Sequence, residues 1–493
     1  MAEAQAQGDA GKQEQTAEVQ VLDDILKVTK AKKSGRESEV KQAIRTLVEE
    51  ASKGIKVSKD AYATIQARIA QIDALLSKQL SAVMHSSEFQ RLESTWRGLS
   101  YLVMNSETGT MLKIRVLNVS KRDLLKDMQK ASEFDQSALF KKVYEAEYGM
   151  FGGQPYGTLI GDYEFENHPE DLELLEKISN VAAAAHAPFI AASSPKMFNL
   201  DGFTQLDKPR DLAKIFDSVE FAKWKSFRDS EDSRYVGLTM PHILLRLPYG
   251  SKTVKVDAFD YEEEVDGTEH NRYLWGNAAW AFGARLTDAF AKYQWCVAIR
   301  GVEGGGIVQG LPTHTFRTDE GEIALKCPTE IAITDRREKE LADLGFIPLC
   351  HCKNTDYAAF FSVQSAQKPK EYNKSTATAN ARLSAQLQNI YAVSRFAHYL
   401  KAIMRDKIGS FMSRDQCEGF LKTWIAQYVL LNDNAGQEAK AKHPLREAQI
   451  QVVEDPAKPG AYNAICHLRP HFQLDELNMS LRLVSKLPPP AGG

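Results

Sequence analysis

Two short stretches of the 493-residue sequence contain residue types that could do chemistry. In "RGVEGGGIVQG", glycines follow a strand-like run, as in turns that bind the phosphates of a dinucleotide. Gly304 and Gly306 fit the first two glycines of that pattern, but Gln309 stands in the third place. Pro312 also interrupts the helix that should follow. A tight surface loop is therefore favoured, and an α/β enzyme that binds a phosphorylated ligand at Gly301–Gly310 is the alternative function.

The second stretch contains Cys350, His351 and Cys352, whose side chains are all possible metal ligands. Neighbouring side chains of a strand point to opposite faces, so His351 would face away from both thiols. No second pair at zinc-ligand spacing occurs elsewhere in the sequence. Packing in the core is the favoured interpretation, and we expect no metal and no cofactor.

The remaining motifs point away from catalysis. The acidic run "YEEEVDGTEH" lacks the spacing of a calcium loop and is interpreted as a solvated loop. There is no G-x-S-x-G nucleophile motif. The sequence therefore predicts a protein that is not an enzyme.

Composition is typical of a globular protein, with 43% apolar and 26% charged residues. The net charge of −3 gives no basic field for nucleic acid. No apolar run reaches the roughly 18 residues that a membrane helix needs, so we expect no membrane insertion. The N-terminus lacks a secretion signal and six cysteines are scattered, which predicts reduced thiols in the cytoplasm.

The first part of the chain is predicted to be a tail followed by a helical arm. Residues 1–19 have almost nothing to bury and are expected to be disordered. Residues 20–85 should form the arm, which begins with the short amphipathic run "VLDDILKVTK". Two longer helices are expected at about 37–53 and 58–84, because apolar residues recur there at helical spacing. Their stripes include Val40, Ile44 and Leu47 in the first helix and Ile65, Ile69, Ile72 and Leu76 in the second.

Residues 86–370 alternate between strand-like and helical runs, which predicts an α/β domain. A helix should open with a capping box at Ser87 and Gln90. The expected strands are "LKIRVLNV", "GTLIGDYEF", "PFIAAS", "WCVAI" and "FIPLCHC". The expected helices are "RDLLKDMQ", "PEDLELLEKISNVAAAAHA", "NAAWAFGARLTDAFAKY" and "DRREKELADLG".

Residues 376–493 predict a small α+β domain of two helices followed by three strands. The first helix runs from about Thr376 and the second starts at a Ser413/Gln416 capping box. The strands are "REAQIQVVED", "AYNAICHLRP" and the stretch near the end, in which Met479, Leu481 and Leu483 alternate with Arg482 and Val484. This last strand could close a meander in its own chain or pair with another subunit, and the pattern leaves both open.

The pattern of the N-terminal run also allows two interpretations. Leu22, Ile25 and Leu26 form an apolar edge that could lie in a groove of another protein, or the helix could pack on its own domain. The disordered stretch before it and the basic linker after it favour a tethered recognition helix.

Long phrases of the sequence resemble one known family. They occur in the family's order from about Leu22 to Pro488, and they are far more specific than any short motif: "FQRLESTWRGLSYLV", "LKIRVLNVSKRDLLKD", "PYGTLIGDYEF", "DSRYVGLTMPHILLRLPYG", "CPTEIAITDRREKELADLGFIPL", "HYLKAIMRDKIGSF" and "LRPHFQLDELNMSLRLVSKLP". Together they resemble the large subunit of the type VI secretion contractile sheath, the TssC/VipB family.

This resemblance implies that the chain is a structural protein in the cytoplasm of a Gram-negative bacterium. It implies pairing with a small subunit (TssB/VipA), polymerisation with other copies around a tube of Hcp, attachment to baseplate components, and contraction. It also implies that the AAA+ ATPase ClpV recognises an N-terminal helix, which the family pattern places on Leu22, Asp23, Asp24, Ile25 and Leu26. The two arm helices would bind small-subunit helices. The C-terminal region would have a gpW/gp25-like fold whose terminal strand joins an intermolecular sheet.

Overall fold

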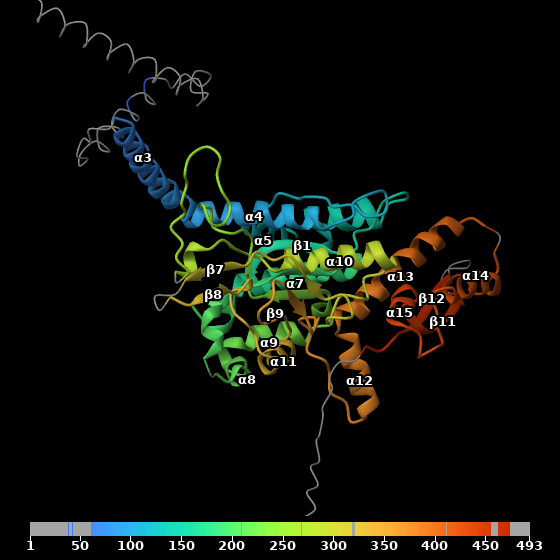
Figure 1. The fold of residues 1–493 in the computed structure, drawn as a ribbon. Coiled ribbons are helices and arrows are strands. Elements are labelled where there is room, and N and C mark those ends of the chain that lie inside the picture. The colour runs from blue at the N-terminus through green and yellow to red at the C-terminus, as the bar shows by residue number, and fades with distance from the viewer. Residues whose placement is uncertain are drawn as a thin grey trace, which may run out of the picture. The chain divides into compact units, whose positions relative to one another are not determined.

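The computed structural model describes residues 38, 42, 61–208, 210–267, 269–317, 321–410, 412–454 and 462–473 (Figure 1). Its contacts divide the chain into two compact units. The first unit contains residues 1–90 and 247–273, and the second contains residues 91–246 and 274–493. Several predicted site residues lie outside the described residues, namely Leu22, Asp23, Asp24, Ile25, Leu26, Val40, Ile44, Leu47, Met479, Leu481, Arg482, Leu483 and Val484.

The described part of the first unit consists mainly of one long helix and one loop, and it also contains the start of the next helix. Helix α3 (Ala61–Met84) confirms the helix predicted at about 58–84. The loop is an excursion, residues 247–273, between two short antiparallel strands, β4 (Ile243–Leu244) and β5 (Trp275–Gly276). Segments almost two hundred positions apart in the sequence are therefore neighbours in this unit.

The centre of the second unit is a six-stranded sheet with the order β1-β2-β3-β9-β10-β6. Four strands are parallel: β1 (Leu159–Phe165), β2 (Phe189–Ser193), β3 (Val236–Met240) and β9 (Phe346–His351). The antiparallel strands β10 (Ala358–Phe360) and β6 (Ile307–Val308) extend it. Every residue of β2 and β3 is buried, as expected for parallel strands that are covered on both faces.

Helices cover both faces of this sheet, which confirms the predicted α/β class. Phe189 and Ala191 of β2 face one core, whereas Ile190 faces the other. The first core is covered by α5, α7, α9 and α11, and the second by α10 and the start of α13. The bounds of the second unit's helices up to α11 are α4 (Ser87–Met104, which begins in the first unit), α5 (Lys121–Lys130), α6 (Ala138–Phe140), a π-helix η3 (Lys141–Tyr148), α7 (Pro169–Ala185), α8 (Leu212–Phe216), α9 (Ala222–Asp229), α10 (Ala279–Tyr293) and α11 (Asp335–Asp343).

The start of α13 approaches the sheet closely because β3 contains a glycine. A Cβ atom on Gly237 would lie 2.8 Å from side-chain atoms of Ile190, Ile347 and Leu387. Real Cβ atoms do not come this close, so a larger residue at this position would force the ends of these side chains to shift.

The C-terminal part of the second unit contains helices followed by a β-hairpin. The helices are α12 (Ser375–Ser384), α13 (Leu387–Lys407), α14 (Arg414–Ala426) and α15 (Gln437–Lys442). Strand β11 (Leu445–Glu454) pairs antiparallel with β12 (Tyr462–Pro470) over nearly its whole length. The capping box predicted at Ser413 and Gln416 is confirmed, with both reciprocal hydrogen bonds present.

Four details of the prediction are wrong. Neither "LKIRVLNV" nor "WCVAI" forms a strand. The Gln90 side chain donates to the Asn271 carbonyl instead of capping α4. The helix expected from Thr376 onward is two helices, α12 and α13, that are separated at Ala385 and Gln386.

Two further short strands, β7 (His314–Arg317) and β8 (Ile323–Lys326), form a separate antiparallel pair. The sequence did not predict them. Both strands are only four residues long, and His314 is their one buried residue.

Candidate interaction surfaces

Helix α3 is held by the loop of residues 247–273, which we name the clasp. Ser77 and Ser81 lie one helical turn apart and therefore on the same face of α3. The Ser77 hydroxyl accepts the Glu262 N–H at 3.3 Å, and the Ser81 hydroxyl accepts the Glu264 N–H at 3.4 Å. The Tyr261 hydroxyl lies 3.2 Å from the Ser81 hydroxyl. The two serines thus bind the N–H groups of alternate clasp residues. These contacts fix the register of the clasp against α3.

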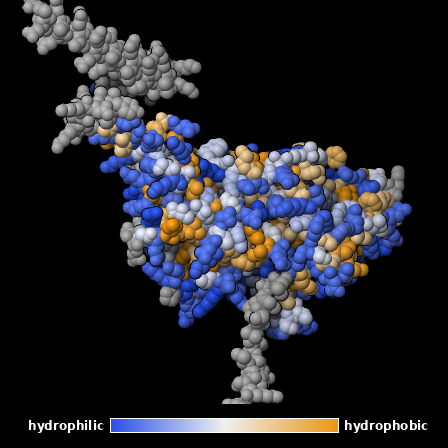
Figure 2. All heavy atoms as spheres, viewed as in Figure 1, coloured by the Kyte–Doolittle hydropathy of each residue, from blue (hydrophilic) through white to orange (hydrophobic). Residues whose placement is uncertain are grey.

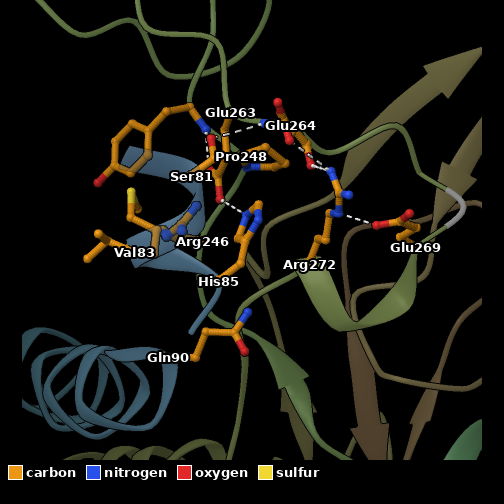
Figure 3. A network of polar contacts seen from close by, with 12 residues as sticks. Ser81, Val83, His85, Gln90, Arg246, Pro248, Glu263, Glu264, Glu269 and Arg272 are labelled. Carbon is orange, nitrogen blue, oxygen red and sulfur yellow. Dashed lines mark hydrogen bonds and ion pairs between the residues drawn. The ribbon is translucent and has the colours of Figure 1, made fainter. Parts of the chain in front are cut away.

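A buried carboxylate completes the clasp, as Figure 3 shows. The Glu263 side chain has no exposed surface. One carboxylate oxygen lies 3.0 Å from Nε2 of His85, and the other accepts the Tyr249 N–H at 2.8 Å. Buried charge is tolerated when both oxygens find donors, so Glu263 holds the clasp to the end of α3. The interpretation of "YEEEVDGTEH" as a solvated loop was therefore wrong for two of its residues, because Tyr261 and Glu263 are both buried.

The rim of the clasp is more exposed. Arg272 donates to the Glu264 backbone carbonyl at 2.8 Å and forms ion pairs with the side chains of Glu264 and Glu269 (Figure 3). Exposed pairs of this kind contribute little to stability, about 0–1 kcal/mol. The buried Glu263, and not the rim, is therefore the important polar contact.

A stripe of apolar residues on α3 is left uncovered by the clasp. Ile69 is 53% exposed and Val83 is 55% exposed, whereas Ile72 and Leu76 are half-buried. Ile65 belongs to the same helix, although its side chain is outside the described set. At 3.6 residues per turn this stripe lies about a third of a turn from the face that carries Ser77 and Ser81. Figure 2 shows apolar residues among hydrophilic ones along this helix.

Helix α4 carries a second exposed apolar stripe, which we did not predict. Leu92, Trp96 and Val103 recur at helical spacing, and Trp96 is 64% exposed. A monomer rarely exposes such a row of large apolar side chains without a partner. The signal was present in the sequence as the spacing of "FQRLESTWRGLSYLV", but periodicity alone does not tell an inward face from an outward one.

The β11–β12 hairpin is a sheet of two strands in the part of the chain that the structure describes. Helix α14 packs on β11, and Glu418 of α14 accepts the Val452 N–H of β11 at 2.9 Å. Within residues 445–454 and 462–473, no further strand pairs with β12. Ile465 of β12 is 47% exposed. An unpaired edge of this length is a template for another strand.

Aromatic contacts fasten this C-terminal part to the α/β body. Trp295 comes from the segment after α10, yet its ring stacks on the Phe396 ring of α13, with the ring centres 4.3 Å apart. It also meets the Tyr428 ring edge-on, with the ring centres 5.2 Å apart. Trp295 is 4% exposed and lies, with Val297, in the core formed by α13, α14, β11 and β12. "WCVAI", predicted as a strand of the α/β sheet, thus places Trp295 and Val297 in the core of the C-terminal part, whereas Ile299 packs in the α/β core.

Helix α13 makes polar contacts with the same body. Nε2 of His398 donates to the Ala185 carbonyl at 2.8 Å, and Arg405 donates to the Tyr148 carbonyl at 2.6 Å. The Lys401 ammonium lies 3.6 Å from the centre of the Tyr148 ring. Burial, together with the nearby charges of Arg395 and Lys401, lowers the pKa of His398 to about 4. The ring is therefore neutral at physiological pH.

One cluster near the carboxyl ends of the parallel strands resembles an acid–base site. His242 has Glu330 at 2.5 Å from Nδ1 and Glu164 at 2.9 Å from Nε2. Burial alone would lower the pKa of His242, but the two carboxylates outweigh it and raise the pKa to about 10. Both ring nitrogens are thus protonated and occupied. The cluster acts as an ionic clamp between strands, because neither nitrogen is available as a base or a metal ligand.

The glycine loop is explained by close backbone packing. The Gly301 N–H donates to the Phe360 carbonyl at 2.7 Å, and the Gly306 N–H donates to the Gly301 carbonyl at 2.8 Å. A Cβ atom on Gly306 would lie 2.6 Å from the Phe360 carbonyl oxygen. These N–H groups already have partners within the chain, so nothing here favours the alternative of a phosphate site at Gly301–Gly310.

The described residues contain neither a metal-binding group nor a membrane-spanning helix. They contain no group of three or more His, Cys, Asp or Glu side chains placed to hold a metal ion. Cys350 lies in the core beneath α11, as predicted. None of the described helices has both the length and the apolar character needed to cross a membrane.

Comparison with known proteins gives a consistent result across most of the chain. Residues 66–367 match the family model VipB, described as the EvpB/VC_A0108 tail sheath N-terminal domain. Residues 376–487 match a second model, the EvpB/VC_A0108 tail sheath gpW/gp25-like domain. A curated relative, the type VI secretion system sheath protein TssC1 of Pseudomonas aeruginosa, is 52% identical over 479 residues, which are 96% of each chain.

Two solved structures align more weakly. The baseplate of the anti-feeding prophage aligns with 64% of this chain and 66% of the other at 8% identity, with a TM-score of 0.35. The contracted helical sheath of the same particle aligns with 62% of this chain and 66% of the other at 10% identity, with a TM-score of 0.28. TM-scores this low support no conclusion.

The gpW/gp25-like match covers the helices α12 to α15 and the β11–β12 hairpin, in agreement with the small α+β domain predicted there. The TssC1 relative aligns with 96% of the chain, which is more than either family match covers alone. On this similarity, the chain belongs to the EvpB/VC_A0108 family of tail sheath proteins and is a large subunit of a type VI secretion sheath.

Proposed function

We propose that the chain forms heterodimers with a small sheath subunit and that these polymerise, in the cytoplasm, into a contractile tubule around an Hcp tube. The proposal rests first on membership of the sheath family over nearly the whole chain. The single structural observation that supports it best is the apolar stripe of α3, which the clasp leaves uncovered although it holds the helix on another face. No catalytic role is part of the proposal.

The stripe is suited to another helix. Ile69, Ile72, Leu76, Leu80 and Val83 recur every three or four residues over four turns, which is the pattern of a helix-packing seam. The clasp fixes the rotation of α3 about its axis, so the stripe is presented in one direction. The small subunit would supply the partner helix, and the segment at about 37–53 would extend the same surface.

Co-expression of the chain with a small sheath subunit tests this proposal. Helical tubules in electron micrographs are the expected result, and only small monodisperse particles under several conditions would contradict it. In the same system, Ile69→Asp and Val83→Asp should abolish copurification of the small subunit. The matched control is Ala82→Asp, because Ala82 is also exposed but lies on neither face.

The β11–β12 hairpin supports a role for the C-terminal strand in polymerisation. We propose that Met479, Leu481, Arg482, Leu483 and Val484 pair with a sheet of a neighbouring subunit. A chain from which residues 479–487 are deleted should still form heterodimers but no stable tubules. Normal tubules from that deletion would disprove the strand's role.

The N-terminal segment has a separate proposed role in recycling. Leu22, Asp23, Asp24, Ile25 and Leu26 would bind an AAA+ ATPase of the ClpV type, with the apolar edge lying in a groove. Replacement of Leu22, Ile25 and Leu26 by Asp should abolish ATPase binding and leave assembly intact. Unchanged binding would place the recognition site elsewhere.

The junction at Trp295 supports a mechanical function. A sheath that contracts must transmit force from the C-terminal domain, where subunits would be linked, to the α/β body. The stacked Trp295 and the three polar contacts of α13 give that connection a rigid, buried character. We propose that the α/β body and the C-terminal part of the second unit move together during contraction while links to neighbouring subunits are kept.

A further inference from the structure

One run with a strong strand sequence lies outside every sheet of the described residues. "LKIRVLNV", residues Leu112–Val119, is rich in β-branched side chains, and its sequence predicts a strand. Neither a helix, a turn nor a bend interrupts this run, yet it forms no strand. A conflict between local sequence preference and the fold of the single chain is expected where a partner completes the structure.

The backbone of this run is held at its two ends only. The Gly109 N–H donates to the Leu112 carbonyl at 2.9 Å. At the other end, the Tyr163 hydroxyl donates to the Val119 carbonyl at 2.8 Å. Between Leu112 and Val119, no N–H or C=O group makes a hydrogen bond within the described parts of the chain. A row of such groups, fixed at both ends, is a template for one further strand.

The side chains at the centre of the run are uncovered. Val116 is 69% exposed and Leu117 is 51% exposed, although neighbouring residues of a strand face opposite sides. Neither side of the run therefore has a cover at this point. Ile114, in contrast, is half-buried and packs against the same small cluster as Ile160 of β1. The run thus lies near the outermost strand of the six-stranded sheet, where a further strand can be added.

The polar side chains of the run leave an excess of positive charge. Arg115 forms an ion pair with Glu147. Lys113 donates to the neutral side chain of Gln154 at 2.8 Å. Arg122, just beyond the run, is exposed, and its side chain has no ion pair or hydrogen bond with any described residue. A strand that pairs here should therefore present acidic or neutral side chains to this surface.

This charge decides between two sources of a strand. The chain's own terminal strand, supplied by a second copy, would bring Arg482 and Lys486 to a surface that is already positive. Like charges that face each other in a strand pair are destabilising. An acidic or neutral strand of a different polypeptide fits the run better.

We propose that Leu112–Val119 becomes a β-strand when one strand of a different polypeptide pairs with it. On the function proposed above, on which this assignment rests, that polypeptide is the small sheath subunit. The incoming strand forms backbone hydrogen bonds along the run and covers Val116 or Leu117. The run is already held at both ends, so little of it has to be ordered when the strand binds.

Amide hydrogen exchange of the full-length chain, alone and copurified with the small subunit, tests this site. The amides of residues 113–118 should exchange rapidly in the free chain and at least about tenfold more slowly in the complex. A complex that forms without this protection would overturn the inference and leave the proposed function standing. If no complex forms, the proposed function fails and the inference fails with it.

Two proline variants show whether the protection comes from strand pairing. Proline removes one N–H group, and the N–H groups of neighbouring strand residues point to opposite edges. Val116→Pro and Leu117→Pro are therefore matched controls for each other. One should weaken binding of the small subunit at least about tenfold, and the other by less than about threefold. Thermal unfolding of the free chain checks that both variants fold, and equal losses of binding in two folded variants would contradict strand pairing.

Deletion of residues 479–487 separates the two sources of a strand. In the complex, the truncated chain should show the same protection of residues 113–118 as the full-length chain, because the terminal strand is not the occupant. Loss of protection in the truncated chain would identify the terminal strand of a second copy as the occupant. That result would overturn the assignment to the small subunit.

Discussion

Two regions of this molecule join distant parts of the chain, and they do so by opposite means. The clasp holds α3 with hydrogen bonds to serine hydroxyls and one buried carboxylate. The Trp295 junction holds α13 and the β11–β12 hairpin with stacked aromatic rings in a closed core. Fully burying a large apolar side chain contributes about 1.5–3 kcal/mol, whereas each net hydrogen bond contributes only about 0.5–1.5 kcal/mol. The junction should therefore be the permanent connection and the clasp the one that opens first.

The largest expected effect is at the junction. Trp295→Ala removes a fully packed ring and should lower the free energy of unfolding by about 3–5 kcal/mol, measured by urea denaturation. Trp96→Ala is the matched control, because the Trp96 ring is mostly exposed and its loss should change stability by less than about 0.5 kcal/mol. Similar losses in the two variants would contradict the view of the junction as a closed core.

A smaller effect at the junction depends on pH. The depressed pKa of His398 means that between pH 6.5 and about 4 the unfolded chain binds a proton that the folded chain does not. Stability is therefore complete above pH 6.5 and falls through this window, by up to about 3 kcal/mol.

His398→Gln keeps a donor for the Ala185 carbonyl but does not titrate. The variant should lose less stability than the wild type when urea denaturation is repeated at pH 7, 5.5 and 4.5. Equal slopes for the two proteins would show that His398 is not the titrating group.

The clasp should respond less and only locally. Glu263→Ala leaves the Tyr249 N–H and the His85 ring without their acceptor, at a cost of about 1–3 kcal/mol. Faster amide exchange is expected in residues 77–85 and 247–267, with no change in α13. Glu269→Gln removes an exposed charge of the same loop and should leave exchange unchanged. Faster exchange in α13 would mean that the two regions are coupled.

The parts of the fold that could be predicted are those determined by residues close together in the sequence. Long periodic segments such as α7, α10 and α3 were predicted correctly, because a helical stripe of apolar residues determines them locally. The strands β1, β2 and β9 were predicted for the same reason, from short apolar runs between turns. The C-terminal capping box was predicted from two residues alone.

The errors share one physical cause, which is that the partner of a segment is distant in the sequence. "WCVAI" has the composition of a strand, but Trp295 and Val297 fill the core of another part of the chain. Glu263 looks solvated beside its acidic neighbours, yet Tyr249 and His85 supply the donors that permit its burial. Ile69 belongs to the predicted stripe, but periodicity could not show that the clasp leaves it exposed.

The plug formed by Trp295 and Val297 has a consequence for how relatives of this chain can be recombined. The gpW/gp25-like match begins at residue 376, so both side chains lie outside the segment that the family model treats as a domain. In a chimera that exchanges only residues 376–487, the incoming domain would have a core shaped to its own parent's residue at position 295, and it would meet Trp295 of this chain instead. Successful grafts should carry residues 294–299 with them, and natural substitutions at Trp295 should be accompanied by changes at Phe396 and Tyr428.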